Sequence, residues 1–478
     1  MLHRAVGNDY ELREGQMRMA VEVARAIIGR GILLCEGATG IGKSFGYLIP
    51  AFSPNTRNIR EQIEGKPKPI ILSTSTKMLQ DQLIETDVPL VAAATQVPLK
   101  VHVAKGRGNY LSKRRLDNFL AQFEANTFEF DSYDAVELAI PQTTAFNDWW
   151  TGIRVNQLNI DGEFNNFTPE HYKRATGEYP KTENIENTFE LHSEILEAVR
   201  SDHQDCLGQQ CENHPNNCPY YKKRNQMDTA DIIIVNHTLL LMHLRNGNIL
   251  PPANTYIIDE AHKFYHTANA VFEISLNLAR IQKFLTSNLA KWKMFLQETQ
   301  TTDRSQIQVV INTLESKISR TTHIAESFFS SYYKLIHQDA LDYDVISPHN
   351  ERYGYTILNI PYQKERLIAE LQGYVELCDT FANECYSELI ADEDIDEDED
   401  TIKSQDQDYN YFLMLSKYAT DLATDTAEVL SFTSPKTYCY WVDVRNCRKN
   451  EDTITGSRLT LKRTPIDITA LIEPLFAA

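Results

Sequence analysis

The segment GATGIGKS, from Gly37 to Ser44, has the residue types and spacing of a loop that binds the phosphates of a nucleotide. It fits the pattern G-x-x-x-x-G-K-[ST] and lies between an apolar run and a stretch with helical character. Glycines let backbone N–H groups approach phosphate oxygens, and the dipole at the start of the next helix favours negative charge. Lys43 would contact the β- and γ-phosphates, and the Ser44 hydroxyl would ligate Mg²⁺. The spacing predicts a nucleoside triphosphate site, which Thr39, Gly40 and Gly42 complete.

A second set of chemical groups is the segment DEAH, from Asp259 to His262, directly after the apolar run TYII. In phosphate-loop enzymes, one acid at the end of a strand can hold Mg²⁺ and another can orient or deprotonate the attacking water. We assign Asp259 to magnesium and Glu260 to the catalytic base, and we expect His262 to link nucleotide state to another domain. An acidic pair is most often only solvated, but its place after a strand favours the catalytic interpretation. The two motifs together predict NTP hydrolysis.

Short apolar runs in the first half of the chain predict the strands that position these motifs. They lie at 31–37, 69–75, 101–106, 231–237 and 255–262, and helical stretches separate them. Continuous apolar runs are typical of strands buried on both faces, and their alternation with helices indicates a parallel α/β sheet. The runs TYCYWVDV and RLTLKRTPIDI near the C-terminus are expected to return to this sheet.

Two long segments interrupt this alternation and predict insertions. Residues 107–228 contain three clustered cysteines, and residues 271–430 are dominated by long helical stretches. The pieces 1–106, 229–270 and 431–478 are then expected to form one nucleotide-binding domain.

The composition excludes several classes of protein. The 478 residues include 47 Lys and Arg against 66 Asp and Glu, which gives a net charge of −19, and 42% are hydrophobic. This is the balance of a globular protein, and no apolar run reaches the roughly 18 residues that suggest a membrane span. Eight cysteines are too sparse for a disulfide scaffold, and no secretion signal is found, so we expect a cytoplasmic protein without a membrane partner. The acidic balance argues against nonspecific coating of nucleic acid but allows a local basic groove.

The motifs, in this order, resemble superfamily 2 helicases of the XPD/DinG type, and the DinG branch looks most similar. The resemblance rests on GATGIGKS, ILSTSTKMLQDQL, VAKGRGNYL, ADIIIVNHTLLL and DEAH. It implies a RecA-like motor domain with an iron–sulfur insertion at 107–228 and a helical, arch-like insertion at 271–430. It also implies an ATP-dependent DNA helicase that translocates 5′ to 3′ on single-stranded DNA and acts at junctions of single and double strands.

The resemblance assigns further residues. Gln16 matches the glutamine that reads adenine, which implies ATP rather than GTP. The residues that match the motif gripping a single-strand backbone are Ser73, Thr74 and Gln80.

Basic and aromatic residues near the first insertion would suit a single-strand channel, although an exposed polar face is the alternative. They are Lys105, Arg107, Tyr110, Lys113 and Arg114, and a second cluster follows at 220–224.

Two features depart from the family pattern. The iron–sulfur domain uses four cysteines, but Ser112 stands where the first is expected, and only Cys206, Cys211 and Cys218 remain. An iron–sulfur cluster, a zinc ion and no metal are all open alternatives. Helicases of this type associated with type IV CRISPR systems can lack a functional cluster, so the chain resembles that subgroup too. After DEAH we find no second parallel α/β series and no paired-arginine signature that would complete the ATP site.

Two interpretations of function therefore stand. The first is an ATP-dependent DNA helicase. The second is a truncated or split module that binds ATP and single-stranded DNA and recruits or senses without unwinding. It would work with a separate second motor domain or a CRISPR effector complex. A nuclease domain is not expected before Gln16, since only 15 residues precede it.

Overall fold

The structure is a computed structural model of the chain. It describes residues 13–38, 40–65, 68–96, 100–116, 199–202, 206, 208–247, 249–298, 304–341, 351–354, 363–391, 399–431, 436–444 and 459–477. The chain divides into two compact units. The first comprises Met1–His203, Glu212–Val271 and Ile468–Ala478, and the second comprises Gln204–Cys211 and Phe272–Asp467.

A parallel sheet of four strands is the centre of the first unit. The strands are β1 (Ile70–Thr74), β2 (Val101–Val103), β3 (Ile232–Asn236) and β4 (Thr255–Ile258), in the order β2-β3-β1-β4. All three pairings are parallel. The two central strands are rich in isoleucine and almost wholly buried, as expected for strands covered on both faces. The prediction of an α/β fold with a parallel sheet is confirmed.

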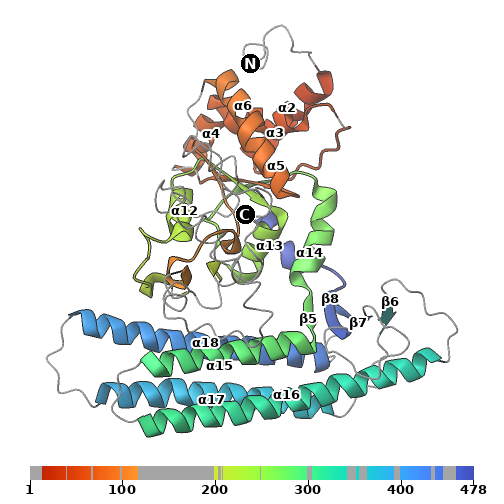
Figure 1. Cartoon of the computed structure of the whole chain (residues 1–478). Coiled ribbons are helices and arrows are strands. Elements are labelled where there is room, and N and C mark those ends of the chain that lie inside the picture. The colour runs from red at the N-terminus through yellow and green to blue at the C-terminus, as the bar shows by residue number, and fades with distance from the viewer. Residues whose placement is uncertain are drawn as a thin grey trace, which may run out of the picture. The chain divides into compact units, whose positions relative to one another are not determined.

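Helices of the first unit pack on this sheet, and Figure 1 shows α2, α3, α4 and α6 grouped together. A shared core joins α2 and α3 to the sheet, with Leu48 and Phe52 packed among residues such as Leu72 and Ile234. The helices are α2 (Glu14–Gly29), α3 (Lys43–Phe52), α4 (Pro54–Glu64), α5 (Lys77–Gln82), α6 (Val88–Thr95), α12 (Pro219–Met227), α13 (His237–Asn246), α14 (Phe264–Phe272), α19 (Thr469–Ile472) and α20 (Pro474–Ala477).

The strand expected at 31–37 does not form, so this prediction is wrong. Residues 31–38 pair with no strand in the described part of the chain, and Ile32 and Leu34 are 77% and 92% exposed. A strand is stable when its backbone N–H and C=O groups find partners. The outer edge of β4 has no strand beside it among the described residues. The apolar run at 31–37 therefore does not extend the sheet there.

Four long helices dominate the second unit: α15 (Leu278–Glu298), α16 (Arg304–Leu341), α17 (Gln363–Ala391) and α18 (Glu399–Ser431). Buried residues on α15 recur at Leu278, Ile281, Leu285 and Trp292, a spacing of three, four and seven that places them on one face. They join one apolar core with residues of the other three helices. These helices fall within 271–430, but their identity as an arch-like insertion stays a prediction.

A separate antiparallel sheet completes the second unit. Its strands are β5 (Ile274–Leu276), β6 (Glu351–Gly354), β7 (Tyr438–Val444) and β8 (Leu459–Pro465), in the order β5-β8-β7-β6. The expectation that the C-terminal strands return to the parallel sheet is therefore wrong. In β8, Leu459 and Leu461 are buried and the residue between them is half-exposed. That alternation is typical of antiparallel strands with one face on a core.

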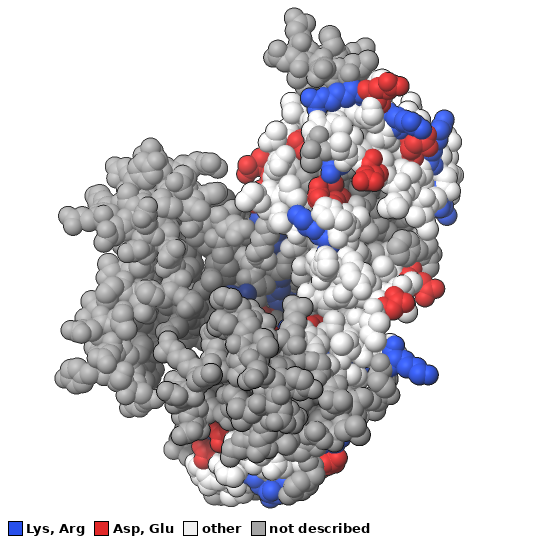
Figure 2. Space-filling view, turned by 90° about the vertical axis from the view of Figure 1, so that its right-hand side faces the viewer, with Lys and Arg blue, Asp and Glu red and all other residues white. Residues whose placement is uncertain are grey.

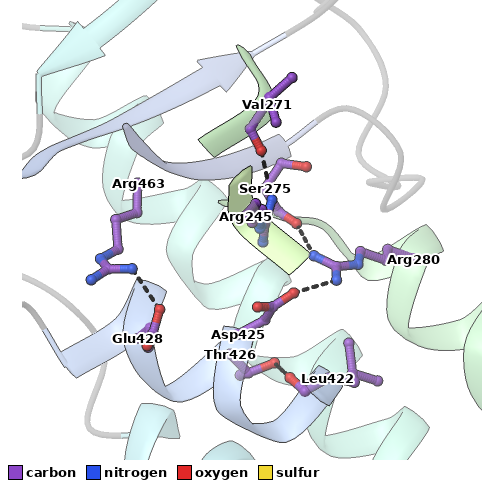
Figure 3. Close-up of polar contacts among 9 residues, drawn as sticks. All are labelled: Arg245, Val271, Ser275, Arg280, Leu422, Asp425, Thr426, Glu428 and Arg463. Carbon is purple, nitrogen blue, oxygen red and sulfur yellow. Dashed lines mark hydrogen bonds and ion pairs between the residues drawn. The ribbon is translucent and has the colours of Figure 1, made fainter. Parts of the chain in front are cut away.

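Polar contacts tie the helices of the second unit to this sheet (Figure 3). Arg280 donates to the Ser275 carbonyl oxygen and to the Asp425 carboxylate, both at 2.5 Å. Arg463 of β8 donates to Glu428 of α18, also at 2.5 Å. The C-terminal end of α18 is thus held by two charge-assisted hydrogen bonds, through Asp425 and Glu428.

Two features of the surface bear on partners. None of the described helices is long and apolar enough to cross a membrane. Figure 2 shows Lys and Arg interspersed with Asp and Glu over the upper part of the molecule, where α2 to α6 lie. The described residues of that face therefore present mixed charge.

Candidate nucleotide site

The phosphate loop depends on two glycines with left-handed backbone conformation. Gly40 has φ of 82° and Gly42, which precedes α3, has φ of 78°. Side chains disfavour this region, and a Cβ at Gly42 would lie 2.2 Å from the Gln16 amide nitrogen. That nitrogen donates to the Gly42 carbonyl oxygen at 3.0 Å. The structure thus packs Gln16, predicted to read adenine, against the loop; Thr39 lies outside the described residues.

The loop and the acidic segment meet, although they are 217 residues apart in the sequence. The Lys43 ammonium lies 3.3 Å from a Glu260 carboxylate oxygen, and both side chains are about a quarter to a third exposed. The second Glu260 oxygen lies 3.5 Å from His262 Nδ1. Glu260 itself has φ of 52°, a left-handed conformation that is uncommon outside glycine.

Asp259 has a partner that the sequence did not reveal. The Tyr47 hydroxyl donates to Asp259 Oδ2 at 3.1 Å, and the Glu260 amide donates to Oδ1 at 3.0 Å. Burial raises the pKa of the Asp259 carboxyl, and these two hydrogen bonds oppose the shift. Burial, and then the charge of Asp259, raises the pKa of Tyr47 far above its usual range. A periodicity argument could have found Tyr47, since it lies one helical turn after Lys43.

Asp87 is a second acid that sequence reasoning missed. Burial raises the pKa of its carboxyl, a hydrogen bond from Ser44 lowers it, and the charge of Asp259 raises it. Asp87 is therefore part of the electrostatic surroundings of both expected magnesium ligands. Asp87 ends a short helical turn, Leu83–Asp87. Its neighbours in the sequence match no motif that would distinguish it from other acidic residues.

The residues present fit a triphosphate and a magnesium ion. A Cβ at Gly40 would meet nothing within 4 Å, so the loop has open space on that side. The Ser44 hydroxyl and the Asp259 carboxylate supply the hard oxygen ligands that Mg²⁺ prefers. The described residues contain no group of three or more His, Cys, Asp or Glu placed to hold a metal. A magnesium ion held by one or two protein oxygens, phosphates and water does not need such a group.

The residues expected to grip a single strand are buried in this structure. Ser73 and Thr74, at the end of β1, are 0% exposed, and Gln80 is 1% exposed. Their side chains are shielded from solvent in this conformation, so their direct contact with a nucleic acid stays a prediction.

The basic and aromatic cluster beside the first insertion is packed on itself. The Arg107 guanidinium carbon lies 4.2 Å from the Tyr220 ring centroid, and Arg107 also donates to the Tyr221 hydroxyl at 3.3 Å. Tyr110 is 2% exposed and meets Tyr220 edge-on, so its ring is shielded in this conformation, and its contact with a base stays a prediction. Lys105 lies 3.7 Å from Asp81.

The other two basic residues of this cluster, Lys113 and Arg114, lie in a short helical segment at 113–116. Lys113 is exposed and Arg114 half-buried. DNA contact by the four basic residues stays a prediction.

The described residues do not form the metal site that the resemblance implied. Cys206, Cys211 and Cys218 are half-buried and not in a disulfide, and they belong to no metal-binding group in the part of the chain that is described. The Ser112 hydroxyl accepts from the Arg115 amide at 3.4 Å and thereby caps the helical segment that follows. His203 and Asp205, which could also donate ligands near these cysteines, lie outside the described residues. Metal binding by these cysteines therefore stays a prediction, with an iron–sulfur cluster, a zinc ion and no metal as the alternatives.

Comparison with known proteins finds that this chain is similar to two DNA helicases and to an exonuclease. The DEAD_2 family model matches residues 168–281. The ATP-dependent DNA helicase YoaA of Haemophilus influenzae is 30% identical over 307 residues, which are 63% of this chain and 40% of that protein. The 3′-5′ exonuclease DinG of Bacillus subtilis is 28% identical over 344 residues, 68% of this chain and 31% of that protein. The ATP-dependent DNA helicase DinG of Escherichia coli is 25% identical over 275 residues, 56% and 34% respectively.

The matched part of the chain spans less than half the length of each of these relatives. The resemblance to helicases of the XPD/DinG type is confirmed by these matches together with the DEAD_2 match.

Proposed function

We propose that this chain is the ATP-hydrolysing part of a DinG-type DNA helicase. The observation that carries the proposal is the pairing of Lys43 with Glu260 at 3.3 Å, beside the Tyr47–Asp259 hydrogen bond. Two motifs that each predict phosphate chemistry are thereby held in one place. Lys43, Ser44 and the loop glycines would bind ATP and Mg²⁺, and Asp259 would complete the magnesium site.

The Lys43–Glu260 pair is best understood as a resting arrangement. The γ-phosphate of ATP competes for Lys43, whose ammonium then contacts phosphate oxygens instead of the carboxylate. Glu260, released from that cation, accepts the proton from the water that attacks the γ-phosphorus as the bond to the bridging oxygen breaks. A bound Mg²⁺ supplies neutralisation of the phosphate charge. The partly exposed ion pair is worth little in stability, so exchanging it costs little.

Translocation from 5′ to 3′ on single-stranded DNA and unwinding at junctions are the activities we propose for the complete protein. They draw support from the order of the motifs and from the names of the helicase relatives. We further propose that 107–228 and 271–430 are insertions into the motor domain, the second of them arch-like. No step is assigned to a metal in the first insertion.

The second candidate is a module that binds ATP and single-stranded DNA without unwinding, and one observation favours it. In the described part of the chain, Glu260 pairs with Lys43 and His262, and neither partner is an arginine that could reach a γ-phosphate. A separate second motor domain, or a CRISPR effector complex, would then supply the missing groups.

ATP hydrolysis by this chain, with and without single-stranded DNA, tests both candidates. We expect Lys43→Ala to abolish ATP binding, and Glu260→Gln to keep binding while turnover falls at least about 100-fold, the usual contribution of a general base. DNA-stimulated turnover that Lys43→Ala removes would favour the helicase, and ATP binding without turnover would favour the module. Full turnover in Glu260→Gln would refute the assignment of the base.

A further inference from the structure

His237, the first residue of α13, lies fully buried at the carboxyl ends of the central strands. Its Nδ1 lies 2.8 Å from the Ser73 hydroxyl, which is itself 0% exposed at the end of β1. Asn236, the residue before it, caps α13 by accepting from the Leu239 amide at 2.8 Å. The cap fixes the start of the helix that carries His237, and the hydrogen bond to Ser73 directs the ring towards the segment expected to grip a single strand.

The same ring also faces the acidic segment. It packs edge-on against Phe264, two residues after His262, with ring centroids 5.2 Å apart. The backbone of Glu260 and Asp259 favours the protonated ring, but burial dominates and lowers the pKa of His237 to about 4. A neutral imidazole has one donor and one acceptor nitrogen, so it can serve two partners at once.

Buried polar atoms without partners surround this contact. Among the described residues they include His237 Nε2, Thr74 Oγ1 and Gln80 Nε2. An unpaired buried polar group is destabilising, and in a native structure it calls for a functional or structural explanation. Ligands of open α/β sheets bind beyond the carboxyl ends of the strands, which is where Thr74 and His237 lie.

The backbone reinforces the link, since the Asp259 amide donates to the Ser73 carbonyl oxygen at 2.8 Å. A shift of the acidic segment is therefore transmitted to the end of β1 by two routes. One is this backbone hydrogen bond, and the other runs through the His237 side chain.

We propose that His237 is a positioning residue that couples the nucleotide site to the segment 73–82 by exchanging hydrogen-bond partners when Glu260 moves. The inference rests on the proposed function, because it needs a nucleotide at the loop and a single strand near that segment. Nucleotide binding then changes the affinity for the strand, and the strand changes the affinity for nucleotide by the same factor.

Two binding measurements on the full chain test this role. The first is the affinity for fluorescein-labelled oligo(dT), by anisotropy, with and without the non-hydrolysable analogue β,γ-imido-ATP and Mg²⁺. The second is the affinity for that analogue alone, by calorimetry. For the unaltered chain we expect the analogue to change oligo(dT) affinity by a factor of about 5 to 150. In His237→Ala this factor should fall towards 1, to the part that the Asp259–Ser73 backbone hydrogen bond alone transmits, while each ligand alone binds within about threefold of the unaltered chain.

His243→Ala is the matched control, because it removes a second histidine from the same helix. His243 Nδ1 accepts from the amides of Ile249 and Leu250 at 3.3 and 3.2 Å, away from the site. This variant should keep the coupling factor.

Ser73→Ala removes the hydroxyl that contacts His237 and changes the side-chain volume little. It replaces His237→Ala in these measurements if that variant fails to fold. It should lower the coupling as His237→Ala does, and the double variant should lower it no further.

The outcomes distinguish failure of the proposed ATP-binding function from failure of the proposed coupling role of His237. A chain that does not bind the analogue refutes the proposed function. If the chain binds both ligands, then an undiminished coupling factor in His237→Ala or Ser73→Ala, or no coupling in the unaltered chain, overturns the role of His237 and leaves ATP binding intact.

Discussion

The carboxyl ends of the parallel strands in the first unit and the junction of helices and sheet in the second unit differ in how their polar side chains are paired and in their backbone conformations. At the junction, Arg280 and Arg463 each have a carboxylate partner, and the Thr426 hydroxyl donates to the Leu422 carbonyl oxygen at 2.8 Å (Figure 3). At the strand ends, His237 and Thr74 each leave a buried polar atom without a partner. The first unit also contains all three described non-glycine residues with positive φ.

This difference indicates that the strand ends of the first unit are the region that can change conformation. At the junction each guanidinium has a carboxylate partner, although Arg463 Nε is itself buried without one, and such charge-assisted pairs favour one arrangement. Unpaired polar groups and left-handed residues such as Glu260 are tolerated where function needs a change of partner. We therefore interpret the second unit as a scaffold and the strand ends of the first unit as the region that responds to ligand.

The distinction between a scaffold unit and a ligand-responsive unit is tested with the largest expected effect by substituting Trp292. Its side chain is 0% exposed in the core of the second unit, so Trp292→Ala should lower the free energy of unfolding by about 3–5 kcal/mol. Urea unfolding followed by circular dichroism measures this change. ATP affinity below the melting temperature should stay unchanged, and a parallel loss of ATP affinity would contradict the division.

An intermediate effect concerns His102 on β2, whose Nε2 is buried without a partner. Burial, and then the charge of Lys223, lowers the pKa of His102 from 6.5 to about 4. As the pH falls, His102 therefore becomes protonated in the unfolded chain at a higher pH than in the folded chain. The stabilisation that neutral His102 provides is present above pH 6.5 and is lost as the pH falls towards 4. Between pH 7 and pH 5 the loss should be about 2 kcal/mol.

His102→Gln isolates this contribution from the titration of acidic groups. The variant should lose about 2 kcal/mol less than the unaltered chain between the two pH values, as measured by urea unfolding. Equal losses in the two proteins would show that His102 is not the group responsible.

The smallest expected change in stability compares two tyrosines. Tyr47→Phe removes the hydrogen bond to Asp259, and Tyr374→Phe removes a buried hydrogen bond to Asn288 Oδ1 of 2.8 Å in the second unit. Each should cost about 1 kcal/mol in unfolding free energy. Only Tyr47→Phe should weaken binding of Mg²⁺-ATP in calorimetry, because its hydroxyl orients a magnesium ligand. Equal nucleotide affinities in the two variants would remove the functional distinction between the units.

The sequence by itself determined the local features that need only neighbouring residues. The glycines of the phosphate loop predicted its left-handed turns, and Lys43 starts a helix as expected. The apolar runs predicted β1, β2, β3 and β4, because continuous burial on both faces leaves a clear local pattern.

Only the tertiary structure decided which segments meet. The contact of Lys43 with Glu260, and those of Tyr47 with Asp259 and of His237 with Ser73, each join residues more than 160 positions apart. Strand formation depends on a partner as well as on composition, so the run at 31–37 stayed unpaired and exposed while equally apolar runs entered the sheet. The C-terminal strands joined β5 and β6 for the same reason: hydrogen-bond partners and an apolar surface were available there. The local sequence pattern shows which side chains a segment can bury. Which other segment covers them depends on the rest of the fold.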